Sequence, residues 1–191
     1  MKKLYITLVA ITTIMMVSCE DSSVLFDASK FQAGSPDNMN EWTITTDSEV
    51  PSGEEWLDDS GEHFTGFAKD LLDGNVNTYW HTDYTKQDYE YIDPYPHWVL
   101  IDMKKENHLV SISVTNRQGN RKGMKKFKLE GSMNGTEFTS LGEFEFQGID
   151  APQSYPLSST NGYRYIKLTA IEGYTAAQFT YLSEISFTVL K

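Results

Sequence analysis

The chain has 191 residues, of which 39% are hydrophobic and 13% aromatic, and its formal net charge is -11. This length and composition fit one folded domain with a core of its own. Nucleic acids and anionic lipid surfaces are bound through clustered Lys and Arg, so the negative charge argues against both as partners. Residues 121–128 form one short basic run, which beside a strand is typical of a solvated face.

The N-terminal residues 1–18 have the pattern of a secretory signal peptide. Two lysines give a positive start, and residues 4–17 are almost wholly apolar or Thr, a stretch too short for a good membrane span. Residues 16–19 resemble the lipobox of bacterial lipoproteins, in which a cysteine becomes lipidated and N-terminal after cleavage. Because Cys19 is the only cysteine, we expect it to carry a lipid anchor. The alternative is an ordinary signal peptide with a cysteine near its end.

Residues 19–39 are rich in Ser, Asp, Asn, Gly and Pro, which predicts a flexible tether before a domain at residues 40–191. The acidic pair Glu20 and Asp21 resembles the signals that send some lipoproteins of Gram-negative bacteria to the outer face of the outer membrane. We therefore expect the protein at the outer membrane, lipid-anchored and exposed at the cell surface.

The rest of the chain alternates between apolar and polar residues over short stretches and has no long helical period. The predicted strands are residues 42–46, 98–102, 108–115, 125–131, 138–146, 163–170 and 181–190. Within residues 108–115, the alternation places Val110, Ile112 and Val114 on one face. Residues 68–72 are expected to form one helical turn. Many short strands of this kind predict an all-β fold, a β-sandwich or jelly roll.

The stretch 71–80 combines a turn, several side-chain oxygens and a large aromatic residue. Gly74 follows Asp73 in a turn where glycine can adopt a positive φ. Oxygens of Asp73, Asn75 and Thr78 follow one another within this loop. Such a loop suits a hard cation such as calcium, which takes several oxygens, including backbone carbonyls. The alternative is a plain Asx turn in which the Asn and Thr side chains satisfy the backbone.

Six motifs follow one another through the second part of the chain. They lie at residues 42–45, 68–80, 97–102, 128–135, 163–168 and 182–185. Together they resemble the discoidin domain, also called the F5/8 type C domain, and in particular the family 32 carbohydrate-binding modules of bacteria. The resemblance implies a β-sandwich jelly roll with a structural calcium near Gly74. It also implies a ligand site in loops at one end of the sandwich.

The resemblance also suggests which residues bind the metal. Carried across residue by residue, it implies calcium ligands at Asp73, Asn75, Thr78 and Glu184. Glu184 is far from the loop in sequence, so a cation there would link both ends of the domain. The alternative for Glu184 is an exposed carboxylate on a strand. The metal is expected to be structural, since nothing around it suggests an activated water.

A sugar ring packs its apolar face on an aromatic side chain, and its hydroxyls need a few placed donors and acceptors. In family members that bind galactose-type sugars, a histidine, an arginine, an asparagine and a loop aromatic form the site. The resemblance implies these roles for His81, Arg117, Asn120 and Phe179. Three of them also have a structural alternative: His81 as a buried histidine, Arg117 as an arginine paired with an acid, and Phe179 as an aromatic in the core. The Tyr-rich insertion at residues 82–96 either adds an aromatic platform or blocks the pocket.

The chain lacks the common catalytic motifs. Its histidines show no metal-ligand spacing, and neither G-x-S-x-G nor a P-loop is present. We therefore predict that the protein is not an enzyme. Together with the family resemblance, this predicts a non-catalytic lipoprotein that binds glycans of galactose type or related sugars. The alternative is an adhesion or assembly module that binds a neighbouring outer-membrane protein, for which a broad tyrosine patch at residues 84–95 would be suited.

Overall fold

The computed structural model describes residues 32–50, 56–57, 63–64, 66–84, 95–159, 161–174 and 179–191. The chain divides into units at residues 1–30 and 31–191, and every described residue belongs to the second. The expected signal peptide and the lipidation site at Cys19 therefore lie outside the described residues. None of the helices within the described ranges has the length and apolar character needed to cross a membrane.

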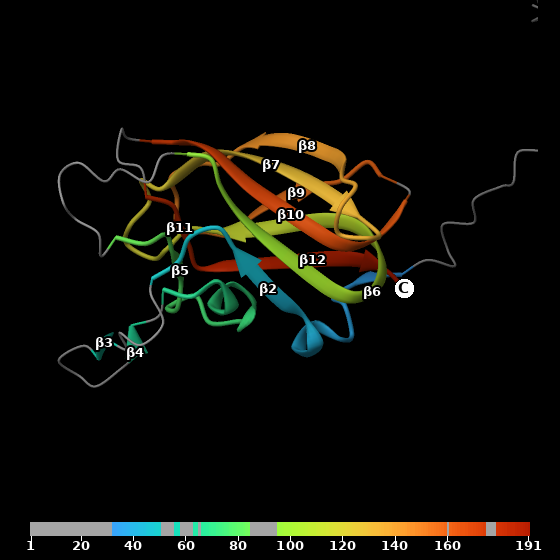
Figure 1. Cartoon of the computed structure of the whole chain (residues 1–191), viewed down its shortest axis with the longest axis horizontal. Coiled ribbons are helices and arrows are strands. Elements are labelled where there is room, and N and C mark those ends of the chain that lie inside the picture. The colour runs from blue at the N-terminus through green and yellow to red at the C-terminus, as the bar shows by residue number, and fades with distance from the viewer. Residues whose placement is uncertain are drawn as a thin grey trace, which may run out of the picture. The chain divides into compact units, whose positions relative to one another are not determined.

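Short antiparallel strands dominate the described part of the chain (Figure 1). The strands are β1 (Ala33–Gly34), β2 (Thr43–Thr46), β3 (Trp56–Leu57), β4 (His63–Phe64), β5 (Trp80–His81), β6 (His97–Thr115), β7 (Met124–Ser132), β8 (Thr139–Glu145), β9 (Gln153–Pro156), β10 (Gly162–Gly173), β11 (Tyr181–Leu182) and β12 (Glu184–Leu190). The 3-10 helices are η2 (Met39–Glu41) and η3 (Ala68–Leu72). The predicted all-β fold and the helical turn at residues 68–72 are confirmed.

The long strand β6 runs through both layers of the fold. Its first half pairs antiparallel with β2 and β10, and its second half pairs with β12 and β9. The first layer continues from β10 to β7 and β8, and in the second layer β1 borders β12. Strands β5 and β11 form a small sheet of their own. The result is a β-sandwich whose two layers share one strand (Figure 1).

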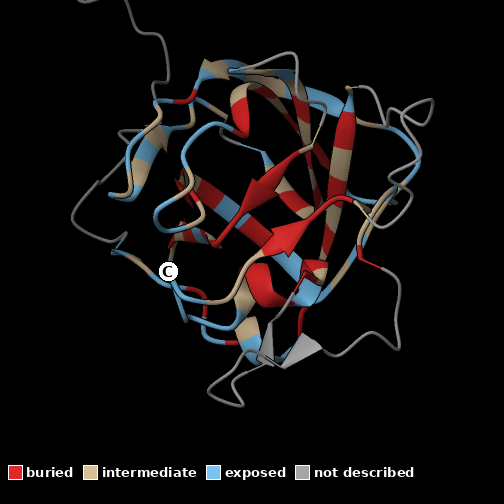
Figure 2. Cartoon of the chain, turned by 90° about the vertical axis from the view of Figure 1, so that its left-hand side faces the viewer, coloured by how far each residue is buried: buried red, intermediate tan, exposed pale blue. Residues whose placement is uncertain are grey.

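Side chains at alternate strand positions fill the core between the layers, and Figure 2 shows buried and exposed residues alternating along the strands. On β7, Phe127 and Leu129 are fully buried, and on β12, Ile185, Phe187 and Val189 are buried. All five lie inward as the alternation predicts. The core therefore draws on both layers, which fixes the loops at each end of the sandwich.

The structure corrects the predicted boundaries of three strands. Residues 98–102 and 108–115 belong to one strand, β6, which has an irregular stretch around Lys104, where φ is +67°. Residues 181–190 form two strands, β11 and β12. The break falls at Ser183, whose backbone N–H donates to the carbonyl of Thr115 at 2.9 Å, while β11 pairs with β5 instead.

One predicted core position in β6 is also wrong. Ile112 and Val114 are buried, but Leu109 lies in the core where the alternation predicted Val110, which is only partly buried. The pairing register between β6 and β12 shifts opposite Thr188. A bulge of this kind moves the following residues to the other face of the strand.

The segment predicted to be a flexible tether, residues 19–39, is structured in its last part. Strand β1 pairs with the end of β12, with Ala33 opposite Leu190. Asn38 is buried, and its Nδ2 donates to the carbonyl of Met103 at 3.0 Å. The folded unit therefore starts at about β1, before the predicted boundary at residue 40.

Candidate functional site

Aromatic rings surround His81 where strands β5 and β11 pair. Tyr181 lies opposite His81 in this small sheet, with ring centroids 5.1 Å apart. Tyr84, Phe179 and Tyr79 approach the same imidazole at centroid distances of 5.0, 5.7 and 6.5 Å. The rings come from separate segments of the chain, so the fold assembles this cluster.

His81 is neutral at neutral pH. It is 8% exposed, and its burial lowers the pKa of the imidazole to about 4, with a smaller contribution from the positive charge of Arg117. The carbonyl of Thr82 lies 2.7 Å from Nδ1 and can only accept, so we assign the proton to Nδ1. Nε2 is then an acceptor, and no described residue hydrogen-bonds to it. Within the described part of the chain, the histidine is thus hydrogen-bonded at one nitrogen only.

Arg117 lies over the ring of Tyr79, with its guanidinium carbon 3.9 Å from the ring centroid. This cation–π contact holds the planar group in place. Among the described residues, no carboxylate lies within ion-pair distance of Arg117, so the alternative of a paired arginine is not observed there. Its N–H groups are therefore available as donors.

Asn120 joins the cluster through Tyr181. The Tyr181 hydroxyl donates to Asn120 Oδ1 at 2.6 Å, which leaves the two Nδ2 protons of the amide as donors. The backbone N–H of Asn120 donates to the carbonyl of Arg117 at 3.1 Å, so a turn holds both residues at one end of β6. Tyr181 itself is 8% exposed. It therefore acts as a buried bridge between His81 and Asn120.

The structure thus brings together the four residues implied by the resemblance: His81, Arg117, Asn120 and Phe179. Tyr79 was missed. The sequence does hold a signal for it. Trp80 is fully buried, and in an extended segment the residues on either side of it, Tyr79 and His81, share the other face.

Both ends of the Tyr-rich insertion, residues 82–96, lie against this cluster. The Tyr84 ring packs edge-on to His81, and the Tyr95 hydroxyl donates to the carbonyl of Phe179 at 3.2 Å. Residues 85–94, which include two of its tyrosines, lie outside the described residues. The described ends of the insertion add aromatic surface beside His81.

The loop after η3 has the hydrogen bonds of an Asx turn. Asp73 Oδ1 accepts from the backbone N–H of Asn75 at 2.8 Å, and Gly74 has a φ of +77°. The Thr78 hydroxyl lies 2.7 Å from Asp73 Oδ2 and 2.6 Å from the carbonyl of Asn75. The turn described as the alternative is therefore present, and it gathers the three predicted ligand residues of the loop.

Glu184 distinguishes this loop from a plain turn. It is the first residue of β12, and its Oε1 is buried with no hydrogen-bond partner among the described residues. Burial is the main cause that raises the pKa of Glu184 to about 8, and the adjacent Asp73 carboxyl raises it further. Hydrogen bonds from the backbone N–H groups of Gly74 and Asn75 lower this pKa, but by less. Glu184 is therefore mostly protonated at neutral pH beside the exposed carboxylate of Asp73, and a cation bound between the two groups would favour its charged form.

The residues present fit a calcium ion. Carboxylate, amide and hydroxyl oxygens from Asp73, Glu184, Asn75 and Thr78 form an all-oxygen set, which hard cations prefer. The described residues hold no group of three or more His, Cys, Asp or Glu side chains that could bind a metal. Backbone carbonyls would therefore have to complete the shell, as calcium sites allow.

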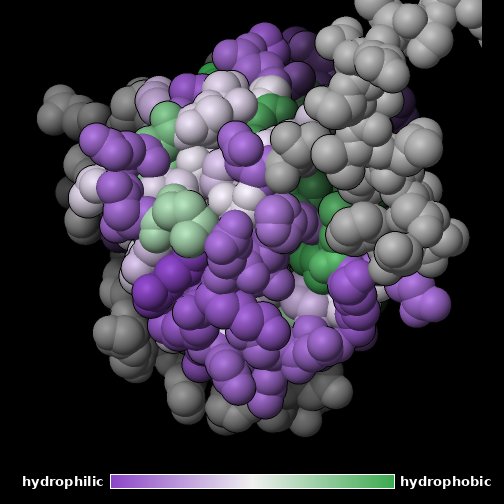
Figure 3. Space-filling model, turned by 90° about the vertical axis from the view of Figure 1, so that its right-hand side faces the viewer, coloured by the Kyte–Doolittle hydropathy of each residue, from purple (hydrophilic) through white to green (hydrophobic). Residues whose placement is uncertain are grey.

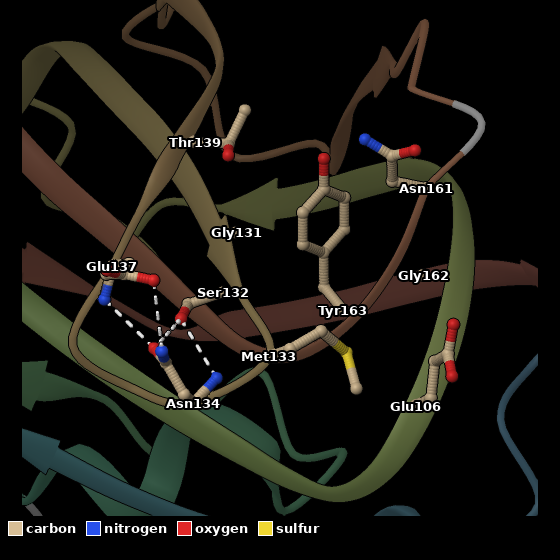
Figure 4. Close-up of a pocket in the computed structure, with 10 residues that line it drawn as sticks. All are labelled: Glu106, Gly131, Ser132, Met133, Asn134, Glu137, Thr139, Asn161, Gly162 and Tyr163. Carbon is tan, nitrogen blue, oxygen red and sulfur yellow. Dashed lines mark hydrogen bonds between the residues drawn. The ribbon is translucent and has the colours of Figure 1, made fainter.

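A separate pocket of about 460 Å³ lies between the β7–β8 turn and the irregular part of β6 (Figure 4). Its polar groups largely bond one another. Asn134 Oδ1 accepts from the backbone N–H of Glu137 at 2.9 Å, and Ser132 Oγ accepts from that of Asn134 at 3.2 Å. These hydrogen bonds are those of a turn, so they explain the polar residues without a ligand.

The face at the C-terminal end of β12, where not covered by residues drawn in grey, is mostly hydrophilic (Figure 3).

A β-sandwich with aromatic and polar side chains gathered in loops at one end offers the kinds of groups that ligand sites combine. The family model of the F5/8 type C domain matches residues 43–185. The chain belongs to this family, as its sequence motifs predicted.

Solved structures share the fold. The C-terminal domain of a chitobiase from Bacteroides fragilis has a TM-score of 0.65 and 28% identity, over 80% of this chain and 95% of that domain. The family 32 carbohydrate-binding module of Clostridium perfringens NanJ, in complex with galactose, has a TM-score of 0.60 and 24% identity, over 81% and 96%. Another C. perfringens module, in complex with GalNAc-β-1,3-galactose, has a TM-score of 0.63 and 21% identity, over 78% and 96%.

A curated relative matches in sequence. A sialidase from Micromonospora viridifaciens is 26% identical over 122 residues, which are 63% of this chain and 18% of the sialidase. The chain therefore corresponds to a small part of that relative.

Proposed function

We propose that this chain is a non-catalytic carbohydrate-binding module for galactose-type or related sugars. One observation carries the proposal: His81, Arg117, Asn120 and Phe179 lie in one cluster. In this cluster, no described carboxylate lies within ion-pair distance of Arg117. Two solved modules of the same fold hold galactose or a disaccharide that contains it, which supports a sugar as the ligand.

The cluster offers the groups that a sugar requires. Phe179 is half-buried and supplies a ring for the apolar face of the sugar. The guanidinium of Arg117 and the amide of Asn120 donate to hydroxyl oxygens, and Nε2 of His81 accepts from a hydroxyl. The low pKa of His81 matters here, because an imidazolium has no acceptor to offer.

The proposal includes a structural calcium held by Asp73, Asn75, Thr78 and Glu184. When bound, the ion would neutralise the two carboxylates and tie the loop to the start of β12. The buried, unpartnered Oε1 of Glu184 supports this assignment.

The proposal also includes a lipid anchor at Cys19 and a place on the outer face of the outer membrane, both argued from the sequence. Many anchored copies on one surface would gain avidity from weak single sites. Labelled fatty acid supplied to the cells should be incorporated into the wild-type protein and not into Cys19→Ala, and equal labelling of the two would contradict the anchor.

A glycan-array screen tests the sugar site. The full chain is kept in a detergent without a sugar headgroup, because residues 4–17 are apolar, and is screened with calcium and again with a chelator. We expect binding to glycans that bear galactose or N-acetylhexosamine. Arg117→Ala should lose this binding, whereas Lys128→Ala, on β7, should retain it.

Thermal unfolding of both variants checks that each is folded. If the folded wild-type chain binds no glycan class, the proposal is wrong. Pull-down from outer membranes would then test the protein-binding alternative.

A further inference from the structure

An open groove of about 530 Å³ lies next to the candidate sugar site. It is lined by Gly119, Asn120, Arg121, Lys122, Gly148 and Tyr174. Its volume is within the range of ligand pockets, roughly 300–1,000 Å³. Asn120 belongs to both places, because its Oδ1 accepts from the hydroxyl of Tyr181, whose ring lies 5.1 Å from that of His81. A ligand longer than one sugar unit can therefore extend from one site to the other.

Tyr174 gives the groove a positioned aromatic wall. Its side chain is 42% exposed, yet its hydroxyl donates to the carbonyl of Phe146 at 2.7 Å. Its backbone N–H donates to the carbonyl of Gly123 at 3.0 Å. Both ends of the residue are thus held while 42% of it stays exposed, an arrangement suited to packing against the apolar face of a sugar.

The groove also contains the first two residues of the basic run at residues 121–128. Each of the three lysines that this run contributes to β7 has a glutamate partner. The pairs are Lys125–Glu172, Lys126–Glu143 and Lys128–Glu130. These three lysines therefore form a solvated face, as the sequence predicted, and their charges are paired.

The two basic residues before β7 are different, because both line the groove. Arg121 forms an ion pair with Asp150, at 3.3 Å between Nε and Oδ1, in which the two side chains are 51% and 38% exposed. Lys122 has no carboxylate within ion-pair distance among the described residues. A cation with no described acidic partner, in the same groove as an exposed aromatic residue, is notable in a chain with a net charge of -11.

We propose that this groove is a subsite for the anionic substituent, a carboxylate or a sulfate, of a glycan whose neutral sugar occupies the His81 site. The inference rests on the proposed function. The ammonium of Lys122 attracts the anion, and the amide of Asn120 donates to ligand oxygens at the junction of the two sites. The ring of Tyr174 packs against the sugar that carries the charge. The protein therefore prefers acidic glycans over their neutral counterparts.

Equilibrium binding to lactose, sialyllactose and lactose sulfate tests this inference on the full chain. We expect at least one acidic glycan to bind more tightly than lactose. Lys122→Gln should weaken acidic binding by about 3- to 5-fold at low salt, the scale of an exposed charge pair, and leave lactose binding unchanged. Lys128→Gln, which removes a lysine outside the groove, is the matched control and should preserve the preference.

Two further measurements separate charge from shape. Asp150→Asn keeps an oxygen acceptor but removes the carboxylate beside Arg121, so it should tighten acidic binding. The acidic preference should also shrink as salt rises from about 30 mM to about 500 mM, because screening lengths shorten.

The outcomes distinguish the two proposals. If lactose binds and the acidic glycans bind no better, or if their advantage survives in Lys122→Gln, the subsite is wrong and the sugar site stands. If neither lactose nor its acidic derivatives bind to the folded chain, the galactose assignment fails and the subsite fails with it. Sialyllactose and lactose sulfate, compared with each other, show which anion the groove takes.

Discussion

Acidification should destabilise the fold through His81. The pKa of this imidazole lies near its ordinary value of 6.5 when the chain is unfolded and at about 4 in the folded protein, because burial disfavours the charged ring. The unfolded chain therefore takes up a proton first as the pH falls. The contribution of His81 to stability is complete above pH 6.5 and is lost progressively between pH 6.5 and pH 4.

The size of this effect follows from the two pKa values. Each unit of difference corresponds to about 1.4 kcal/mol, and the difference is about 2.5 units. The free energy of unfolding should therefore fall by about 3 kcal/mol between neutral pH and pH 4 from this residue alone. Asp47 and Asp102 have pKa values lowered below the ordinary 3.8, so their contributions are lost at still lower pH.

Urea unfolding of the full chain and of His81→Gln, at several pH values from about 7 to 4, measures the effect. Groups that titrate in both proteins cancel in the difference between the two free energies, which isolates His81. The wild type should lose about 3 kcal/mol more than the variant. An NMR titration should place the midpoint of the His81 imidazole near pH 4. Parallel stability curves, or a midpoint near 6.5, would refute the reasoning.

Three further predictions concern the metal and the core. A chelator should lower the thermal unfolding midpoint of the wild type and leave that of Glu184→Gln nearly unchanged. A ligand at 100 times its Kd adds about 2.7 kcal/mol to the stability of the folded state. If the wild type has the same midpoint with and without chelator, a bound calcium is contradicted. Phe127→Ala should cost about 3–5 kcal/mol in urea unfolding, because the ring is fully buried against Phe144, and Phe127→Leu should cost clearly less. Gly131→Ala should cost about 1–3 kcal/mol, since its Cβ would lie 2.5 Å from the buried Tyr163 ring, and a neutral effect would show that the ring moves freely.

Side-chain alternation predicted which residues enter the core wherever a strand pairs regularly. Phe127 and Ile185 are examples, because the period of a strand is two and one face is buried. The exchange of Val110 for Leu109 was not predictable, since the bulge depends on how β6 pairs with β12. The break at Ser183 has the same origin, because a contact with Thr115, far away in sequence, ends the strand there.

The candidate site shows a similar limit. No local pattern connects His81 with Arg117, and only the resemblance of the whole motif order to a known family predicted that they meet. The contact between Arg117 and Tyr79 depends on how a loop and β6 lie in space. Lys122 differs from its neighbouring lysines in having no acidic partner among the described residues, which the sequence of a basic run does not reveal.

Strand β12 determines which way the module faces. It starts at Glu184, beside β11 and the aromatic cluster, and ends at Leu190, where β1 pairs with it. Its seven residues span about 20 Å, so the described chain begins at the end of the sandwich opposite the ligand loops (Figure 1). A pull on the N-terminal side therefore loads the β1–β12 edge and leaves the loops unstrained. If this side is held to a surface, the loops point away from it, toward approaching glycans.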